Sequence, residues 1–391
     1  MDKKCVIWGT GKVGQEIMED VIKGGYTVEA YCDSNAKRQG KEVNNIRIIG
    51  EEELLQSIKE GRITHIIIGV QNPQYIEEIK AKVKEKYPTN IKCVFYREII
   101  DQQENEFLSE NIKKIKFKWE IDFDSQSQIW LDNFMSEVEY WLYSVAKGRG
   151  ILKDEYLSRI NNDDFFGIDK ESKEELRFIK DKDIVLDIGC GLATKYGCRL
   201  DGNKSVEVIP IDPLSSFYNL INSKYSQDKY KKCYFGMFEF IANMYPRNYA
   251  NAIIINNALD HCIDPLKSII ECMYILQVNG TMYMKHRRAE ALFEKYGGLH
   301  RWNLDYANSD FILWNKENAV NVTEKLKDVA EVQVTHNETN ERERQEIIVK
   351  IIKKKDFDLE KYIDIEKERY QLAKFIERFM QWTAEEKILL D

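Results

Sequence analysis

The chain has 391 residues, 43% of them hydrophobic and 32% charged, which is enough for two or three domains with well-formed cores. Its net charge of −8 does not favour a nucleic-acid partner, because proteins that bind phosphate backbones usually carry a basic face. The sequence has no apolar run of about 18 residues that would span a membrane, no signal-peptide pattern, and no Cys-x-x-Cys pair among its eight cysteines. We therefore expect a cytoplasmic protein.

The first predicted element is a strand over residues 4–8, followed by a glycine loop and a helix that runs to about Lys23. A second strand, residues 26–32, ends at Asp33. This is the Gly-x-Gly-x-x-Gly pattern between a strand and a helix, with an acidic residue at the tip of the next strand. The helix N-terminus would hold a phosphate, and the acid a ribose or base. The predicted nucleotide site consists of Gly9, Thr10, Gly11, Lys12, Val13, Gly14 and Asp33.

The sheet of this first domain ends early. Two helix–strand units follow, at residues 51–69 and 73–95, so the domain would span residues 1–98 and lack the second half of a full dinucleotide domain. The stretches 6–17, 30–35 and 40–54 resemble the small Rossmann-like domains in front of bacterial sugar acyltransferases and some glycan methyltransferases. The resemblance covers about residues 3–96 and implies a nucleotide or nucleotide-sugar ligand. The alternative is a scaffold or dimerisation domain with a vestigial loop.

A charged segment, residues 101–124, opens the predicted connector of residues 99–180. We expect it to be a surface connection with at most one short helix or strand. Residues 127–146 then carry apolar side chains at a spacing of three and four, which predicts an amphipathic helix. This helix is expected either to pack in a core or to cover the ligand cleft of the domain that follows.

The central stretch of the chain is residues 183–212. An apolar run at 184–186 predicts a buried strand, a loop with Gly189 and Gly191 follows, residues 192–200 are helix-like, and a strand at 206–211 ends on Asp212. Glycines let the backbone approach a ligand, and an acid at a strand tip can accept both hydroxyls of a ribose. The order resembles the S-adenosylmethionine (SAM) site of class I methyltransferases, Asp/Glu-x-Gly-x-Gly-x-Gly, with Ala193 at the third glycine. The plainer alternative is an ordinary βαβ unit with a tight turn.

Later segments extend this pattern over residues 181–354. Strands are expected at 232–235, 252–255, 280–285, 329–336 and 346–353, which gives the seven-strand class I order with an antiparallel last strand. The fold class would then be α/β, with two Rossmann-like, doubly wound sheets. The resemblance implies that SAM is held by Asp187, Gly189, Cys190, Gly191, Asp212, Pro213, Leu214, Met237, Phe238, Glu239, Asn256 and Asn257.

Motifs toward the end of this domain indicate which group of methyltransferases the chain resembles. Residues 257–261 (NALDH), the pair at 264–265 (DP) and residues 298–303 (GLHRWN) occur together. They are similar to a subgroup of methyltransferases associated with bacterial surface-glycan clusters, over about residues 125–350. That subgroup carries Asn-Glu-Ala-Glu after the fifth strand, whereas this chain has Arg-Arg-Ala-Glu at 287–290. Trp302 would stack on a sugar face or pack in the core.

Methyl transfer to a sugar hydroxyl requires the removal of a proton, which a histidine or carboxylate can accept near neutral pH. Three of the five histidines fall on loops predicted at the carboxyl end of the sheet, where α/β active sites form. The catalytic candidates are His286, His300, His261, Asp260 and Glu290. The same residues offer ligands for a divalent metal, but no tight ligand spacing supports one, so we expect none.

The tail, residues 355–391, carries apolar residues at helical spacing over 357–382, which predicts a helix packed on its own chain or between subunits. The sequence as a whole predicts a SAM-dependent methyltransferase that O-methylates a sugar in a nucleotide-sugar or surface-glycan pathway. Its partner would be a small-molecule or glycan acceptor, and homo-oligomerisation is left open. Two alternatives remain: an NAD-dependent sugar oxidoreductase that uses the N-terminal loop, and a non-catalytic, nucleotide-binding regulatory protein.

Overall fold

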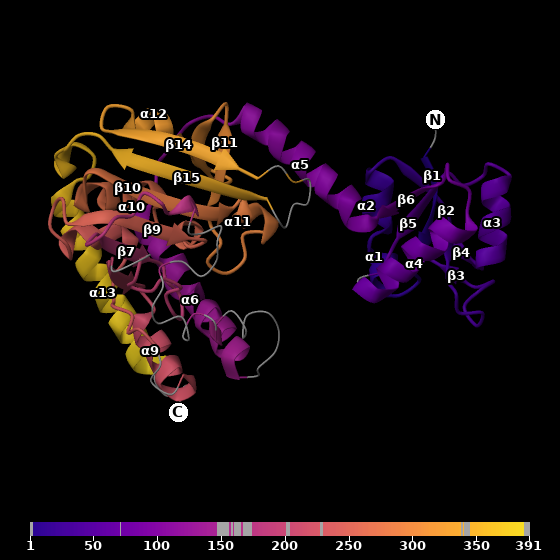
Figure 1. Cartoon of the computed structure of the whole chain (residues 1–391), viewed down its shortest axis with the longest axis horizontal. Coiled ribbons are helices and arrows are strands. Elements are labelled where there is room, and N and C mark those ends of the chain that lie inside the picture. Colours follow the sequence, from indigo (N-terminus) through magenta and orange to yellow (C-terminus); the bar gives the residue numbers. More distant parts are fainter. Residues whose placement is uncertain are drawn as a thin grey trace. The chain divides into compact units, whose positions relative to one another are not determined.

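The computed structural model in Figure 1 describes residues 3–70, 72–146, 156, 157, 159, 166, 174–200, 204–226, 230–337, 339 and 345–386. The chain divides into two compact units. Unit 1 comprises Met1–Lys114 and Glu338–Gln345, and unit 2 comprises Ile115–Asn337 and Glu346–Asp391. Part of the predicted connector, including residues 147–155, lies outside the described residues.

Unit 1 is built on a six-stranded sheet, counted over its described residues, in the order β3-β4-β2-β1-β5-β6. All neighbouring pairs are parallel except β3 and β4, which are antiparallel. The strands are β1 (Lys3–Trp8), β2 (Tyr26–Cys32), β3 (Glu42–Val43), β4 (Ile46–Ile49), β5 (His65–Ile68) and β6 (Lys92–Phe95). The central strands β1 and β5 are buried on both faces, which explains their nearly continuous apolar sequences.

The helices of unit 1 differ from the expectation at two places. The helix predicted to run to about Lys23 is divided at Ile17, and residues 101–114, expected to be mostly a surface connection, belong to a helix of 19 residues. That helix belongs to unit 1, where Tyr96 and Ile99 are buried in the core and Gln103 donates a hydrogen bond to the backbone oxygen of Asp20 at 2.8 Å. The helices are α1 (Lys12–Glu16), α2 (Met18–Lys23), α3 (Glu51–Lys59), α4 (Pro73–Lys86) and α5 (Tyr96–Lys114).

The glycine loop of unit 1 depends on two close backbone approaches. Gly9 has a φ of +123°, which side-chain-bearing residues rarely adopt. A Cβ atom at Gly14 would lie 2.0 Å from the carbonyl oxygen of Gly9, so no larger residue fits there. Gly11, by contrast, has a φ of −72°, and a Cβ atom added there would meet no other atom within 4 Å. The loop geometry therefore requires glycine at two of its three glycine positions.

This difference predicts the outcome of two matched substitutions. Gly14→Ala should destabilise unit 1 by about 3 kcal/mol, because a backbone oxygen would have to move. Gly11→Ala should cost less than about 1 kcal/mol, the small penalty of alanine at a helix N-cap. Hydrogen exchange of peptides from β1 and β5 in the full chain measures both effects. Equal protection of these strands in the two variants would show that the loop is not packed as described.

Unit 2 contains the larger six-stranded sheet, in the order β14-β15-β10-β9-β7-β8 over the described residues. β10, β9, β7 and β8 are parallel, and β15 is antiparallel to both of its neighbours. The strands are β7 (Ile184–Ile188), β8 (Glu207–Ile211), β9 (Ala250–Asn256), β10 (Leu276–Arg287), β14 (Ala330–His336) and β15 (Glu346–Lys353). Six of the seven strands expected for the second domain are therefore present among the described residues, including the antiparallel last strand.

Two segments of unit 2 differ from the sequence expectation. The strand predicted at 232–235 is reduced to a single parallel bridge between Tyr234 and Ile211 beside β8. Residues 192–200, expected to be helical, form turns and irregular backbone instead. A second, three-stranded antiparallel sheet was not predicted, and consists of β11 (Asn303–Ala307), β12 (Asp310–Trp314) and β13 (Ala319–Asn321).

Aromatic side chains join three helices of unit 2: α6 (Phe123–Ala146), α9 (Ser215–Tyr225) and α13 (Ile365–Glu386). Phe134 of α6 lies 5.3 Å from Phe379 of α13 and 5.9 Å from Phe217 of α9, measured between ring centroids. The C-terminal helix therefore packs on its own chain, one of the two placements expected. Among the described helices, none is both long and apolar enough to cross a membrane.

Candidate functional site

A cavity of about 640 Å³ opens in unit 2 beyond the carboxyl ends of β7, β8 and β9. Every residue predicted to contact SAM lines it. These residues are Asp187, Gly189, Cys190, Gly191, Asp212, Pro213, Leu214, Met237, Phe238, Glu239, Asn256 and Asn257. Loops that are far apart in the sequence thus meet at one edge of a parallel sheet, which is where ligands bind in open α/β folds.

The loop after β7 brings bare backbone to the cavity wall. Gly189 and Gly191 have φ values of +72° and +64°. A Cβ atom at Gly189 would lie 2.4 Å from the Cβ of Ala258 and 3.0 Å from the ring of Phe238. Glycine is therefore required at this position by backbone conformation and by space together.

Asp212, at the tip of β8, links two of the loops. Its side chain is buried, and its two carboxylate oxygens accept hydrogen bonds from the backbone N–H groups of Gly191 at 3.1 Å and Leu214 at 2.8 Å. Burial raises the pKa of Asp212 to about 7, although both hydrogen bonds favour the ionised form. Each oxygen retains a further lone pair with which it can accept a ligand hydroxyl.

Two other acids at this end have structural partners. Asp187 accepts a hydrogen bond from the Thr194 hydroxyl at 2.6 Å, and burial raises its pKa. Glu239 belongs to the short helix η1 (Phe238–Asn243), and its Oε1 accepts hydrogen bonds from the backbone N–H groups of Ile263 at 2.5 Å and Asp264 at 3.2 Å. Glu239 therefore ties η1 to the start of α10 (Pro265–Ile275), a role that the sequence did not indicate.

Helix α6 supplies one wall of the cavity. Trp130, Glu137, Tyr140 and Trp141 from this helix line the cavity, and Trp141 donates a hydrogen bond from its indole N–H to Glu137 at 2.9 Å. The Trp141 ring lies against Gly191, since a Cβ there would be 3.4 Å from the ring. The helix was expected either to pack in a core or to cover the ligand cleft. In the structure it does both, because part of it packs in the core and part lines the cavity.

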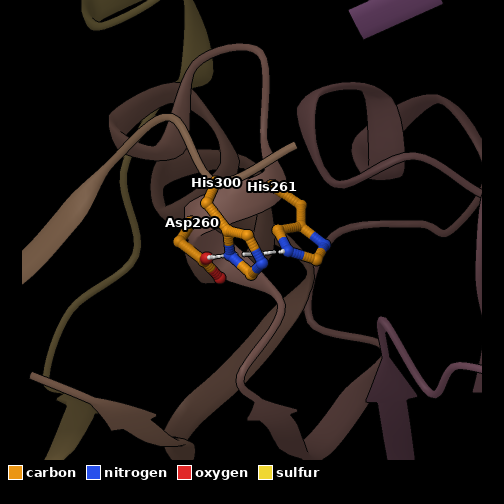
Figure 2. Close-up of side chains that lie close together, drawn as sticks. All are labelled: Asp260, His261 and His300. Carbon is orange, nitrogen blue, oxygen red and sulfur yellow. Dashed lines mark hydrogen bonds and ion pairs between the residues drawn. The ribbon is translucent and has the colours of Figure 1, made fainter. Parts of the chain in front are cut away.

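The other end of the cavity is polar. His261, Glu290 and His300 line it, and Figure 2 shows Asp260, His261 and His300 facing one another. Asp260 and His261 belong to the short helix η2 (Leu259–His261) after β9, and His300 comes from a loop some forty residues later. Asp260 Oδ2 lies 2.7 Å from His300 Nδ1, and His261 Nε2 lies 3.2 Å from the same nitrogen.

The charges of this cluster depend on one another. Burial opposes ionisation of Asp260, but the adjacent His261 and His300 lower its pKa to about 2. Burial also opposes protonation of His300, but contact with Asp260 raises its pKa. The negative charge of Asp260 and a proton on His300 therefore favour each other.

His286 is separate from the cavity lining. It was expected on a loop, but β10 extends to Arg287, so His286 lies inside the strand, opposite Ile347 of β15. Its ring is buried, burial lowers its pKa to about 4, and neither ring nitrogen has a partner among the described residues. Glu290 begins α11 (Glu290–Phe293) and accepts a hydrogen bond from Arg287 at 3.1 Å.

Trp302 positions the loop that carries His300. The indole N–H of Trp302 donates a hydrogen bond to the backbone oxygen of Cys262 at 2.8 Å, and its ring stacks on Trp119 with centroids 4.9 Å apart. The N–H of Arg301 donates to the backbone oxygen of Asp260 at 3.1 Å. Trp302 is fully buried, so of the two roles expected for it the structure shows the packing one.

The predicted site in unit 1 centres on Asp33. Its carboxylate accepts hydrogen bonds from the Thr10 hydroxyl, from the N–H of Asn35 at 2.9 Å and from Arg38 at 3.1 Å. Burial opposes its ionisation, but these hydrogen bonds lower its pKa overall. Arg38 was not predicted; a basic residue five positions after the acid was the signal that could have indicated it.

Comparisons with known proteins give one family match and several structural similarities. The family model described as C2185-like, N-terminal, matches residues 1–94. No curated protein sequence matches the chain at a significant level.

Among solved structures, a candidate sarcosine dimethylglycine methyltransferase from Galdieria sulphuraria is 11% identical, covers 56% of this chain and 99% of its own, and gives a TM-score of 0.36. A SAM-dependent methyltransferase from Aquifex aeolicus is 15% identical, with 47% and 89% coverage and a TM-score of 0.31. A UDP-D-quinovosamine 4-dehydrogenase from Vibrio fischeri is 19% identical, with 24% and 78% coverage and a TM-score of 0.21.

Proposed function

We propose that unit 2 is a SAM-dependent methyltransferase that O-methylates a sugar of a nucleotide-sugar or a surface glycan. The observation that carries this proposal is the composition of the cavity in unit 2. One end has the glycine loop and Asp212, which suit a nucleoside, and the other end has His261, His300 and Glu290, which suit a hydroxyl that must lose a proton. The sugar acceptor is inferred from the resemblance of the NALDH and GLHRWN motifs to surface-glycan methyltransferases.

The residues at the nucleoside end fit SAM. Asp212 can accept hydrogen bonds from both ribose hydroxyls, and Gly189 and Gly191 present their backbone at the cavity wall. Met237 and Phe238 give an apolar wall suited to adenine. When bound, SAM supplies a methyl group attached to a positively charged sulfur.

The acceptor end determines where the proton goes. A sugar hydroxyl is too weakly acidic to ionise in water at pH 7, so the chain must favour its deprotonation. His261 and His300 line the cavity, whereas His286 lies within β10 and outside the cavity lining. His286, His300, His261, Asp260 and Glu290 remain the predicted catalytic residues, and among the histidines we give priority to the two that line the cavity.

The ligand of unit 1 stays a prediction. A nucleotide or nucleotide-sugar, or less favourably NAD, is supported by the tight loop at Gly9 and Gly14 and by Asp33 at the tip of β2.

Binding of SAM is the first test. Replacing Asp212 by Ala should weaken SAM binding by at least about 100-fold, since two charge-assisted hydrogen bonds, each worth about 1.5–3 kcal/mol, would be lost. Asp33→Ala is the matched control, because it removes the corresponding acid from unit 1 and should leave SAM affinity unchanged. Isothermal titration calorimetry with SAM measures both variants. Absence of binding to the wild-type chain, or equal loss in the two variants, would exclude SAM at the proposed site.

The pH dependence of SAM affinity is the second test. The pKa of Asp212 is raised to about 7, and the ionised form accepts hydrogen bonds from both ribose hydroxyls. Binding therefore releases a proton below pH 7, and affinity should fall by up to about tenfold for each pH unit below that value. Asp212→Asn, which cannot ionise, should bind more weakly and lose this pH dependence. A wild-type affinity that stays constant between pH 5 and pH 8 would contradict the proposed contact.

The cavity histidines provide a third test. His300→Ala and His261→Ala should each lower turnover of a methylated sugar acceptor by about 10²–10⁴-fold, the usual contribution of a group that handles the transferred proton. SAM affinity should change by less than about threefold, because neither residue belongs to the nucleoside end. Turnover within threefold of the wild type in both variants would indicate that Glu290 or Asp260 accepts the proton instead.

A further inference from the structure

The polar end of the cavity brings three potential metal ligands together. The distances among Asp260 Oδ2, His300 Nδ1 and His261 Nε2 are 2.7, 3.2 and 3.6 Å. Atoms that bind one ion at about 2.0–2.2 Å lie about 3–3.5 Å from one another. We propose that these three atoms hold a divalent transition-metal ion, contrary to the sequence expectation that no metal is bound.

Hydrogen bonding alone does not account for this arrangement. Each of the three atoms can offer a lone pair to a cation when it carries no proton, and Figure 2 shows the three side chains facing one another. If His300 Nδ1 donates its hydrogen to Asp260, then His261 Nε2 can only share that same N–H group. If His300 Nδ1 carries no hydrogen, it can accept one from His261 Nε2, but its lone pair then opposes those of the ionised Asp260 Oδ2. A cation at the centre of the three atoms would satisfy all of them at once.

The identity of the donors indicates the class of metal. Two imidazole nitrogens and one carboxylate oxygen form the facial set found in mononuclear transition-metal sites, with the remaining positions open. Mg²⁺ and Ca²⁺ prefer oxygen ligands throughout and fit this set poorly. The set therefore favours Zn²⁺, Co²⁺, Mn²⁺ or Fe²⁺.

The surroundings of the three atoms support a built site. The Asp260 side chain is 1% exposed, and its Oδ1 has no hydrogen-bond partner among the described residues. An unpartnered buried carboxylate oxygen is costly, and a nearby cation offsets that cost. His261 and His300 remain open to the cavity, so an ion can enter from it. The Arg301 N–H bonded to the Asp260 backbone fixes the two segments that supply the ligands.

The function of such an ion rests on the proposed methyltransferase activity, whereas its binding does not. The site lies at the end of the cavity assigned to the acceptor. A divalent cation there would favour the loss of a proton from a hydroxyl beside it. His261 and His300 would then act as ligands, and the same substitutions would lower turnover by removing the ion.

Metal binding can be measured on the full chain without any activity assay. Protein treated with a chelator and dialysed is titrated with Co²⁺, followed by its visible absorption spectrum, and with Zn²⁺, followed by calorimetry. We expect one ion per chain. His261→Ala and His300→Gln should each weaken binding by at least about 100-fold, because even residues that only orient metal ligands contribute about 10–100-fold. His336→Ala is the matched control, since His336 lies on β14 and stacks on Tyr306.

Two results would overturn the proposal. One is a wild-type chain that binds SAM but neither Co²⁺ nor Zn²⁺. The other is metal binding that His261→Ala and His300→Gln leave unchanged, which would place the ion on other residues. SAM affinity measured on the same samples confirms that each variant is folded. It also separates the two proposals, because a chain that binds metal at these residues but not SAM would contradict the proposed function alone.

Discussion

The carboxylate of Asp212 is the interaction on which the nucleoside end of the cavity depends. It accepts the N–H of Gly191 from the loop after β7 and the N–H of Leu214 from the segment after β8. One buried acid therefore fixes two neighbouring loops while keeping lone pairs for a ligand. The pKa of Asp212 is raised to about 7, so the two backbone hydrogen bonds stabilise its negative charge only in part. Hydroxyl groups of a ligand would stabilise that charge further.

A second buried carboxylate organises the opposite end. Asp260 follows β9, as Asp212 follows β8, and these two strands flank β7 in the sheet. Asp260 holds His300 beside His261, and Trp302 anchors the same loop to Cys262. The cavity thus lies between two acids at the tips of the strands on either side of β7, one at the end proposed for the nucleoside and one at the end proposed for the acceptor. Helix α6 covers the interval between them with Trp141 and its neighbours.

The sequence predicted the parts of this fold that depend on local patterns. The apolar runs of β7 and β9, the strand order and the residues around Asp212 follow from hydrophobic runs, glycines and acids at strand tips. Contacts between distant segments could not be predicted in this way. His286 was misplaced because pairing with β15 extends β10 beyond the apolar run that defined it. The grouping of Asp260 and His261 with His300 depends on Trp302 docking, and ligands about forty residues apart show no metal-binding spacing.

The central claim is that the cavity of unit 2, and not the glycine loop of unit 1, binds the adenosyl ligand. A crystal structure of the chain grown with S-adenosylhomocysteine tests it most directly. The account predicts that the ribose hydroxyls lie within hydrogen-bond distance of Asp212 and that the sulfur points toward His261 and His300. A ligand found at Gly9–Gly14 with its ribose on Asp33, or in the cavity of unit 2 with no contact to Asp212, would contradict it.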